Sequence, residues 1–179
     1  LLEHAPVLAQ AVGKMASVQV RNTATIGGNL CTASPGGDTA PPLLTLDAEV
    51  ILKDRSRERA VPLTEFFTGP GLNGMQHGEL LVGVRFAAMP AGERPCHLKL
   101  GRRKTFTLSV VSVAVRVSLD GDIFRDVRIA LGAVAPTPMR AYQAEKALIG
   151  RPCDADTIEA ATRTVRDEIN PRSSARASA

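Results

Sequence analysis

The stretch from Arg21 to Pro42, RNTATIGGNLCTASPGGDTAPP, determines how the rest of the chain is interpreted. It holds two Gly-Gly pairs, several hydroxyl side chains, an Asn and an Asp, but few side chains that could pack in a core. Consecutive glycines can adopt positive φ, so that successive N–H groups converge on an anion, and the missing Cβ atoms let a ligand approach the backbone. Two such turns suit a dinucleotide better than a single phosphate. The composition therefore predicts a loop that cradles a polar ligand.

The same glycines are also compatible with ordinary bulges and hairpins, which Gly-Gly pairs commonly mark. Their spacing is neither G-x-G-x-x-G nor that of a P-loop, because no Lys-Ser or Lys-Thr pair follows them. The chain also lacks a G-x-S-x-G motif and a plausible Cys–His nucleophile pair. Rossmann-type binding, nucleotide hydrolysis and acid–base catalysis therefore lose support, and no catalytic residue is predicted.

The whole chain has the composition of a folded protein. Its 179 residues are 44% hydrophobic and 22% charged, enough for one ordinary domain or two small ones. The most apolar run, Leu108 to Leu119, contains Ser109, Ser112 and Arg116 and is shorter than the roughly 20 residues of a membrane span. No secretory signal segment opens the sequence. We expect a cytoplasmic protein without a membrane span.

Charge and cysteine usage exclude other classes. The three cysteines are scattered without a CxxC pair, which argues against a metal site or an iron–sulfur cluster in this chain. The net charge of +4 is unevenly spread, with −2 on residues 1–93 and +6 on residues 94–179. Aromatic residues make up only 3%, however, and the sole basic cluster is Arg102-Arg103-Lys104. A nucleic-acid-binding module needs a broader basic surface. We expect a solvated face or a subunit-docking surface there, and no nucleic-acid partner.

Periodicity divides the chain at the punctuated segment 87–95. Before it we predict a helix, a short extended segment, a second helix that starts at the Pro-Pro pair, three strands and a loop. The two helices are predicted at residues 2–15 and 40–46, and the extended segment at 17–21. The three strands are predicted at 49–53, 59–63 and 80–86, and the loop at 67–74.

After the boundary, a strand is predicted at 97–103, and residues 111–119 alternate with a period of two. Asp120-Gly121 predicts a tight hairpin to a return strand at 127–131, and helices follow at 142–149 and 154–169. The pattern indicates an α+β unit with an antiparallel three-stranded sheet, one face of which is buried by helices.

Residues 20–50, VRNTATIGGNLCTASPGGDTAPPLLTLDAEV, closely resemble the second flavin loop of the FAD-binding subunit, or domain, of the molybdenum hydroxylases. That family includes xanthine dehydrogenase, aldehyde oxidases, aerobic carbon monoxide dehydrogenase and 4-hydroxybenzoyl-CoA reductase. The similarity continues through VPLTEFFTGPG, GELLVGVRF, HLKLGRRKTFTLSVVSVAVRV and INPRSSARASA, essentially to the end of the chain. It implies that residues 1–90 form the second lobe of a two-lobed FAD-binding α/β domain, and that residues 91–179 form a C-terminal α+β domain.

The resemblance also implies which residues contact FAD. The loop that wraps the pyrophosphate and reaches the flavin edge is matched by Thr25, Ile26, Gly27, Gly28 and Asn29. Polar contacts on the ADP side are matched by Thr32 and Asp38, with Gly37 where some relatives have Ser, and apolar contacts by Leu81 and Met15. Lys99 matches a lysine near the isoalloxazine ring, where positive charge would favour the reduced flavin and so tune electron transfer.

The implied function is that of an FAD-binding electron-transfer component. In the family, substrate is oxidised at a molybdenum cofactor in one partner, and electrons pass through two [2Fe–2S] clusters in another partner to the flavin. They leave to NAD or another acceptor. The cysteine-rich insertion that carries an extra cluster in 4-hydroxybenzoyl-CoA reductase is missing after Cys31, so that cluster is not expected.

The first flavin lobe and a final arginine-containing helix of the relatives have no counterpart in these 179 residues. We therefore expect a fragment that is inactive alone, and the alternative is a docking domain that no longer retains FAD. If each half of the cradle supplied about 5 kcal/mol, losing one would weaken binding by several thousandfold, since about 1.4 kcal/mol is tenfold.

Overall fold

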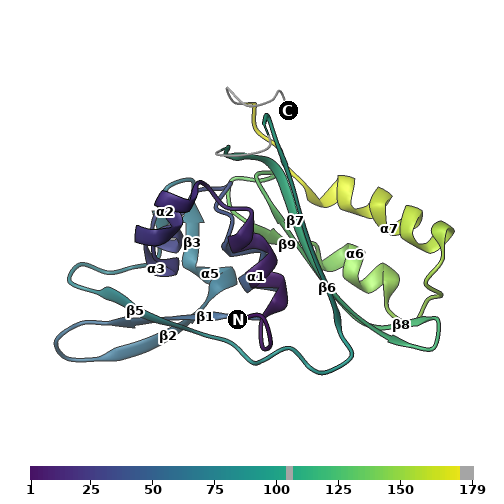
Figure 1. The fold of residues 1–179 in the computed structure, drawn as a ribbon, viewed down its shortest axis with the longest axis horizontal. Coiled ribbons are helices and arrows are strands. Elements are labelled where there is room, and N and C mark those ends of the chain that lie inside the picture. Colours follow the sequence, from purple (N-terminus) through teal and green to yellow (C-terminus); the bar gives the residue numbers. More distant parts are fainter. Residues whose placement is uncertain (104–106, 174–179) are drawn as a thin grey trace.

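The computed structural model describes residues 1–103 and 107–173. The elements form two groups that lie against each other (Figure 1). The first group comprises α1 (Pro6–Gly13), α2 (Val18–Thr23), α3 (Ile26–Cys31), α4 (Ala40–Thr45), β1 (Glu49–Lys53), β2 (Glu58–Pro62), α5 (Leu63–Phe66), β3 (Phe67–Gly69), β4 (Leu72–Asn73) and β5 (Leu80–Arg85). The second comprises β6 (Arg94–Gly101), β7 (Ser109–Asp120), β8 (Ile123–Gly132), β9 (Met139–Arg140), α6 (Tyr142–Leu148) and α7 (Ala155–Glu168).

The first group contains a small antiparallel sheet in the order β2-β1-β5. Side chains of β1 alternate, so that Val50 and Leu52 are buried while Lys53 is exposed. The three predicted strands are thereby confirmed. The loop predicted at residues 67–74 was wrong in part, because β3 and β4 pair there as a short hairpin. Gly71 turns the chain between them with a φ of +74°, a conformation that favours glycine.

The second group is built on an antiparallel sheet in the order β6-β7-β8-β9. Its three long strands confirm the predicted sheet, and β9 adds a two-residue edge. The hairpin between β7 and β8 turns at Gly121, which has a φ of +57°. Both predicted helices are confirmed as α6 and α7, and α7 begins after Asp154, whose carboxylate accepts a hydrogen bond from the Thr157 backbone N–H (2.8 Å).

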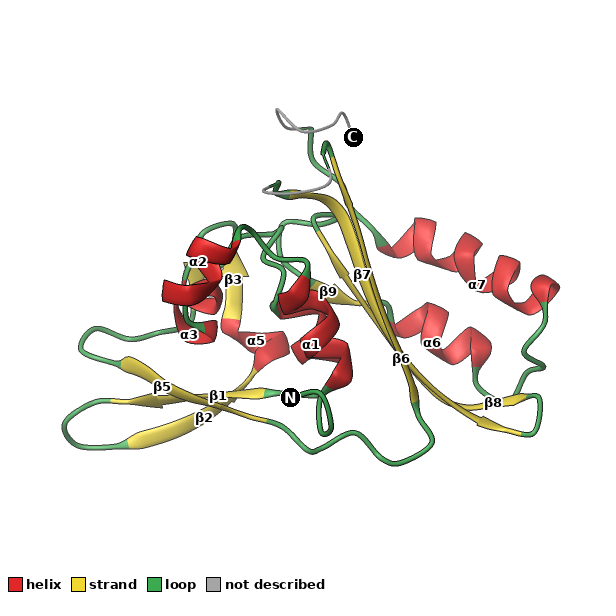
Figure 2. Cartoon of the chain, viewed as in Figure 1, coloured by secondary structure: helices red, strands yellow, loops and turns green. Residues whose placement is uncertain are grey.

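Helices lie on both sides of the long strands (Figure 2). On one side, Val117 and Ile129 pack beneath α6 and α7. On the other side, Ala114 and Ala130 belong to the core of the first group. The prediction of a single buried face was therefore wrong. The second face was missed because its residues are mostly small and do not form an apolar pattern in the sequence. Their small size lets α4 approach closely: a Cβ on Gly132 would lie only 3.1 Å from Pro41 Cγ of α4.

Two arginines of the second sheet join the groups. Arg116 of β7 donates to the Glu93 carboxylate (2.8 Å) and to the carbonyl oxygen of Thr45 (2.9 Å). Arg140 of β9 contacts the carboxylates of Glu145 and Asp47, each at 2.6 Å. Because Thr45 and Asp47 lie in and after α4, both arginines fix that helix against the second sheet.

The glycine-rich stretch differs most from its prediction. The extended segment predicted at residues 17–21 was wrong, because residues 18–23 form α2, and α3 runs through Gly27 and Gly28. Neither of these glycines, nor Gly36 or Gly37, has a positive φ, so the predicted left-handed turns were wrong. Hydroxyl side chains explain the helices, because an N-cap oxygen satisfies an otherwise unpaired N–H of the first turn. Thr25 Oγ1, for example, accepts a hydrogen bond from the Gly28 N–H (3.0 Å).

Within residues 1–103 and 107–173, none of the helices has both the length and the apolar character needed to cross a membrane. The same ranges contain no group of His, Cys, Asp and Glu side chains arranged to hold a metal ion.

Candidate functional site

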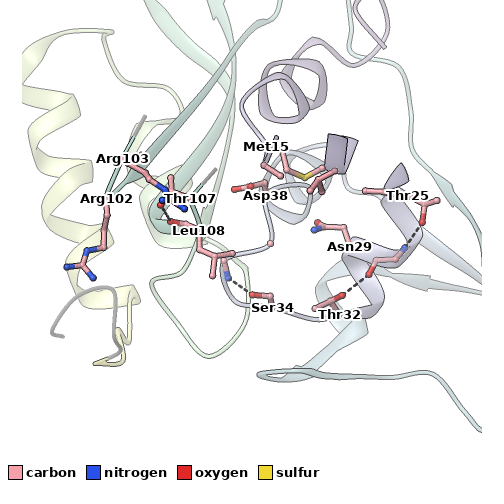
Figure 3. A pocket seen from close by; sticks show the side chains of 16 residues that line it. Met15, Thr25, Asn29, Thr32, Ser34, Asp38, Arg102, Arg103, Thr107 and Leu108 are labelled. Carbon is pink, nitrogen blue, oxygen red and sulfur yellow. Dashed lines mark hydrogen bonds between the residues drawn. The ribbon is translucent and has the colours of Figure 1, made fainter. Parts of the chain in front are cut away.

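A cavity of about 1070 Å³ lies between α2, α3, the segment 34–38 and the connection that follows β6 (Figure 3). Around α2 the lining is apolar and consists of Met15, Ala16, Val20 and Ala24, and Leu108 adds an apolar side chain from the connection that follows β6. The polar side chains of Thr25, Asn29, Thr32, Ser34 and Asp38 also line the cavity. An apolar wall can take the face of a planar ring, while hydroxyls, an amide and a carboxylate can bind phosphate and sugar groups.

The two glycines of α3 have different surroundings. Gly28 lines the cavity, so its backbone is open to a ligand. A Cβ there would lie 3.1 Å from Thr25 Oγ1 and would disturb the cap of α3. Gly27 faces the other way, where a Cβ would lie 3.4 Å from Leu81 Cδ2 of β5. Gly27 therefore permits close packing of α3 on the sheet, and Gly28 provides a surface for the cavity.

The second glycine pair is held in a turn by neighbouring side chains. Gly37 donates its N–H to the Ser34 carbonyl oxygen (2.9 Å), and Gly36 donates to Ser34 Oγ (3.3 Å). Asn29 Oδ1 accepts hydrogen bonds from the hydroxyl (2.6 Å) and the N–H (3.4 Å) of Thr39. The carbonyl end of Asn29 is therefore committed to the protein, and its amide end is the part that remains for a ligand.

Asp38 is buried at the edge of the cavity and is held on both oxygens. Lys99 Nζ donates to Oδ2 (2.7 Å), and Ser109 Oγ donates to Oδ1 (2.8 Å). Lys99 itself does not line the cavity and is almost completely buried behind Asp38. A buried ion pair with additional hydrogen bonds is the arrangement in which a carboxylate can remain charged away from water.

His97 lies on β6 two residues before Lys99. Burial, reinforced by the positive charges of Lys14 and Lys99 and opposed by Asp38, lowers the pKa of His97 to about 4. Its imidazole is therefore neutral at neutral pH, and neither ring nitrogen has a hydrogen-bond partner among the described residues. The positive charge in this layer of the protein comes from the lysines and not from His97.

The nine predicted contact residues divide into two sets. Those that line the cavity are Thr25, Gly28, Asn29, Thr32 and Asp38, and Met15 and Gly37 line it as well. The cavity lining does not include Ile26, Gly27, Leu81 or Lys99. Ile26 and Leu81 pack against the core, and Gly27 touches Leu81. Direct contact of these residues with a cofactor stays a prediction.

The far side of the cavity was not predicted as part of the site. Arg102, Arg103, Thr107 and Leu108 line it, although the arginines were interpreted as a solvated or docking surface. Lys104 of the same cluster lies outside the described residues. The information that was missing is long-range: Lys99 and Ser109, which flank these residues in the sequence, both contact Asp38, which lies 61 and 71 positions earlier in the chain.

Comparison with known proteins gives the same assignment for both halves. Residues 1–88 match the family model described as the FAD binding domain in molybdopterin dehydrogenase, and residues 97–179 match the CO dehydrogenase flavoprotein C-terminal domain. The chain belongs to the FAD-binding subunits of the molybdenum hydroxylases. This family membership confirms the resemblance that the sequence indicated.

Individual members of the family agree in sequence and in fold. The xanthine dehydrogenase FAD-binding subunit of Escherichia coli O157:H7 is 36% identical over 98% of this chain and 60% of that protein. The carbon monoxide dehydrogenase medium chain of Hydrogenophaga pseudoflava is 32% identical over 87% of this chain and 54% of that protein. A solved structure of carbon monoxide dehydrogenase from H. pseudoflava superposes with a TM-score of 0.94 at 31% identity, covering 98% of this chain and 61% of that one. The chain thus spans about 60% of the length of these FAD-binding relatives.

The cavity fits the cofactor for which the family is named. FAD combines a planar ring system with a diphosphate and several hydroxyl groups, and the cavity has an apolar wall beside an open glycine backbone and a polar edge. A Cβ on Gly37 would come within 3.2 Å of the Ser34 carbonyl oxygen, and one on Gly28 within 3.1 Å of Thr25 Oγ1, so a side chain at either position would force these neighbours to move.

Proposed function

We propose that this chain binds FAD in the cavity between α3 and the β6–β7 connection and acts as part of the flavoprotein component of a molybdenum hydroxylase. The proposal rests on two independent features that coincide: a sequence match to the family's flavin loop, and a cavity at the same place. Residues that match the flavin loop of the family, among them Thr25, Gly28 and Asn29, lie together on one cavity. That cavity has the size and chemistry of a dinucleotide site.

In this proposal each part of the cavity binds a different part of the ligand. The Thr25 hydroxyl and the Asn29 amide donate to the diphosphate, and the missing side chain of Gly28 lets it approach α3. The Thr32 hydroxyl donates to the Gly28 carbonyl oxygen (2.9 Å) and can accept a hydrogen bond from a hydroxyl group of the ligand. Apolar side chains such as Met15 bind a ring face. Ile26, Gly27 and Leu81 support α3 from behind, and Lys99 holds the Asp38 carboxylate at the edge of the site.

Bound FAD would supply the redox chemistry, because it accepts and releases electrons that protein side chains cannot carry. The partners would be a subunit with the molybdenum cofactor, a subunit with [2Fe–2S] clusters, and NAD or another electron acceptor. The names of the relatives support this scheme, since they describe FAD-binding or medium chains of dehydrogenases. Within the chain, residues 1–90 would provide the FAD-binding lobe and residues 91–179 the C-terminal domain.

A docking domain that does not retain FAD is the second candidate. It is favoured by the coverage of the relatives, because residues beyond the matched 60% of their length are available to supply further cofactor contacts. A contribution of about 5 kcal/mol from this chain alone corresponds to a dissociation constant of about 0.2 mM. The two candidates therefore differ in a quantity that can be measured.

Equilibrium titration of the purified chain with FAD, followed by the fluorescence of the flavin, separates them. We expect saturable binding near 0.2 mM and at least tenfold weaker binding for Gly28→Val, because the new side chain occupies the cradle. Gly13→Val is the matched control, since a Cβ at Gly13 has no atom within 4 Å. A folded chain without measurable FAD binding would leave only the docking function. Equal affinity of the wild type and Gly28→Val would exclude this cavity as the site.

A further inference from the structure

Asp38 is the only carboxylate among the described residues that line the cavity. Its two oxygens are fixed from the protein side by Lys99 Nζ at 2.7 Å and Ser109 Oγ at 2.8 Å. The side chains of Lys99 and Asp38 are 7% and 9% exposed, and Ser109 is fully buried. Both donors therefore approach the carboxylate from inside the protein.

A carboxylate has about four lone-pair sites for hydrogen bonds, and Lys99 and Ser109 occupy two of them. The remaining capacity of Asp38 is available on the side of the cavity. The positive charge of Lys99 is compensated by the same carboxylate, and His97, behind the pair, is neutral at neutral pH. What this part of the cavity presents to a ligand is thus an oriented acceptor rather than a free cation.

The resemblance to the family placed Asp38 at the ADP side of FAD and Lys99 at the isoalloxazine ring. Their side chains are joined by a 2.7 Å hydrogen bond, whereas adenine and isoalloxazine are separated by a ribose, a diphosphate and a ribityl chain. An extended FAD therefore does not have its two ends in contact with these two residues at once while the ion pair persists.

We propose that Lys99 and Ser109 are positioning residues that hold the Asp38 carboxylate as the acceptor for a hydroxyl group of the ligand. Lys99 then acts on the ligand through Asp38 and does not touch the flavin ring. The hydroxyl belongs either to the ribose of the ADP part or to the ribityl chain of the flavin part, which share this chemistry. The inference rests on the proposed FAD site.

The test is titration of the purified chain and its variants with ADP, which carries only the ribose, and with FMN, which carries only the ribityl chain. Ser109→Ala removes one donor without leaving an unpaired charge. We expect it to weaken binding of one of the two ligands about tenfold and to leave the other unchanged, and we expect Asp38→Asn to weaken the same ligand at least as much. Ser118→Ala is the matched control, because Ser118 is a buried hydroxyl further along β7.

The role of Lys99 is tested by comparing its substitution with and without the Asp38 carboxylate. Lys99→Met leaves Asp38 buried without its cation, so the variant is paired with the double variant Lys99→Met/Asp38→Asn, which removes both charges. We expect the double variant to bind no more weakly than Asp38→Asn alone, because Lys99 acts through the carboxylate. The absorption spectrum of bound FMN reports direct contact, and we expect the double variant and Asp38→Asn to have the same spectrum.

Two results would overturn the inference while leaving the FAD site intact: unchanged affinities in Ser109→Ala and Asp38→Asn, or a flavin spectrum that changes with Lys99 when Asp38 is already Asn. A wild-type chain that binds neither ADP, FMN nor FAD would overturn the proposed function together with this inference. The two failures are therefore distinguishable.

Discussion

Asp38 and His97 show how differently single buried polar groups can be satisfied in one layer of the protein. Asp38 accepts a hydrogen bond on each oxygen. The His97 backbone is equally well paired, since its N–H donates to Gln10 Oε1 and its carbonyl oxygen accepts from Lys14 Nζ. The His97 ring, however, has no partner on either nitrogen among the described residues. Such a group costs free energy when it must become charged.

His97 should make the free energy of unfolding depend on pH. Its pKa is lowered to about 4 in the folded protein from 6.5, so the unfolded chain binds a proton more readily. The contribution of the neutral His97 ring to the free energy of unfolding is therefore fully present above pH 6.5 and is lost as the pH falls toward 4. At about 1.4 kcal/mol per pKa unit, the loss attributable to His97 is about 3 kcal/mol.

Urea unfolding followed by circular dichroism between pH 7.5 and 4 measures this loss. We expect His97→Leu to remove most of the dependence above pH 4.5 and to change the stability little at pH 7.5. Hydrogen bonds from Arg59 and from the Gln76 N–H lower the pKa of Glu79 to about 2 from 4.5. Its own contribution to stability is therefore lost only below about pH 4.5 and does not mask the effect of His97 above that pH. An identical pH profile for His97→Leu would contradict the assignment.

At the scale of single residues, the sequence predicted which residues of the glycine-rich stretch line the cavity better than it predicted which distant residues contact them. A family motif of contiguous residues identified Thr25, Gly28 and Asp38, all of which line the cavity. Ser109 and the arginines before it were not recognised, because their place in the site depends on a contact with Asp38 across 71 positions of the chain. No local pattern contains that information.

At the scale of elements, capping determined what the glycine-rich stretch became. α2 and α3 have six residues each, and both begin at a hydroxyl side chain that accepts an N–H three positions later. Serine and threonine are typical residues at the N-terminus of a helix. The four glycines in the same stretch nevertheless led to the prediction of loops. Strands were easier to predict, because the alternation of apolar and other residues over 111–119, which lie in β7, has no competing interpretation.

The close approach of α4 to the second sheet predicts a strong effect of a minimal substitution. A Cβ on Gly132 would lie 2.5 Å from Ser112 Oγ and 3.1 Å from Pro41 Cγ. We expect Gly132→Ala to lower the free energy of unfolding by about 1–3 kcal/mol, because overpacking forces the surrounding atoms to move.

Gly13→Ala is the matched control for that substitution. Gly13 ends α1, and a Cβ there meets no atom within 4 Å. We expect a gain of up to about 1 kcal/mol from the higher helix propensity of alanine. Thermal unfolding of both variants measures the difference, and equal stability of the two would show that α4 and β8 are not in close contact.

At the scale of the whole molecule, the two groups of elements behave as one unit because they share a core and a buried charge cluster. Ala114 and Ala130 of the second sheet pack among the core residues of the first group. The guanidinium of Arg140 is fully buried and contacts Glu145 in its own group and Asp47 next to α4. The composition predicted a boundary at residues 87–95, but it did not predict this shared core, because small residues on a strand resemble an exposed face.

Removing Arg140 should therefore destabilise the entire chain. We expect Arg140→Met to lower the free energy of unfolding by about 3–5 kcal/mol, since the Glu145 carboxylate is left buried without its cation. Arg163→Met is the control, because its ion pair with Glu159 lies on the exposed surface of α7 and such pairs contribute about 1 kcal/mol or less.

The fluorescence of Tyr142, the only tyrosine in a chain without tryptophan, reports the second group, and circular dichroism reports both. We expect the two signals to unfold together in urea for the wild type and for both variants. Separate transitions would show that the groups fold independently and would contradict the shared core.

The most direct test of the FAD site is a titration of the isotope-labelled chain with FAD, observed through its backbone amide signals in nuclear magnetic resonance spectra. This method detects binding even near 0.2 mM and locates it in a chain of 18.9 kDa. We predict saturable shifts at the amides of Gly28, Asn29, Gly37 and Asp38, with one dissociation constant, and their loss in Gly28→Val. Saturable shifts confined to other parts of the protein, with these four amides unmoved, would contradict the account.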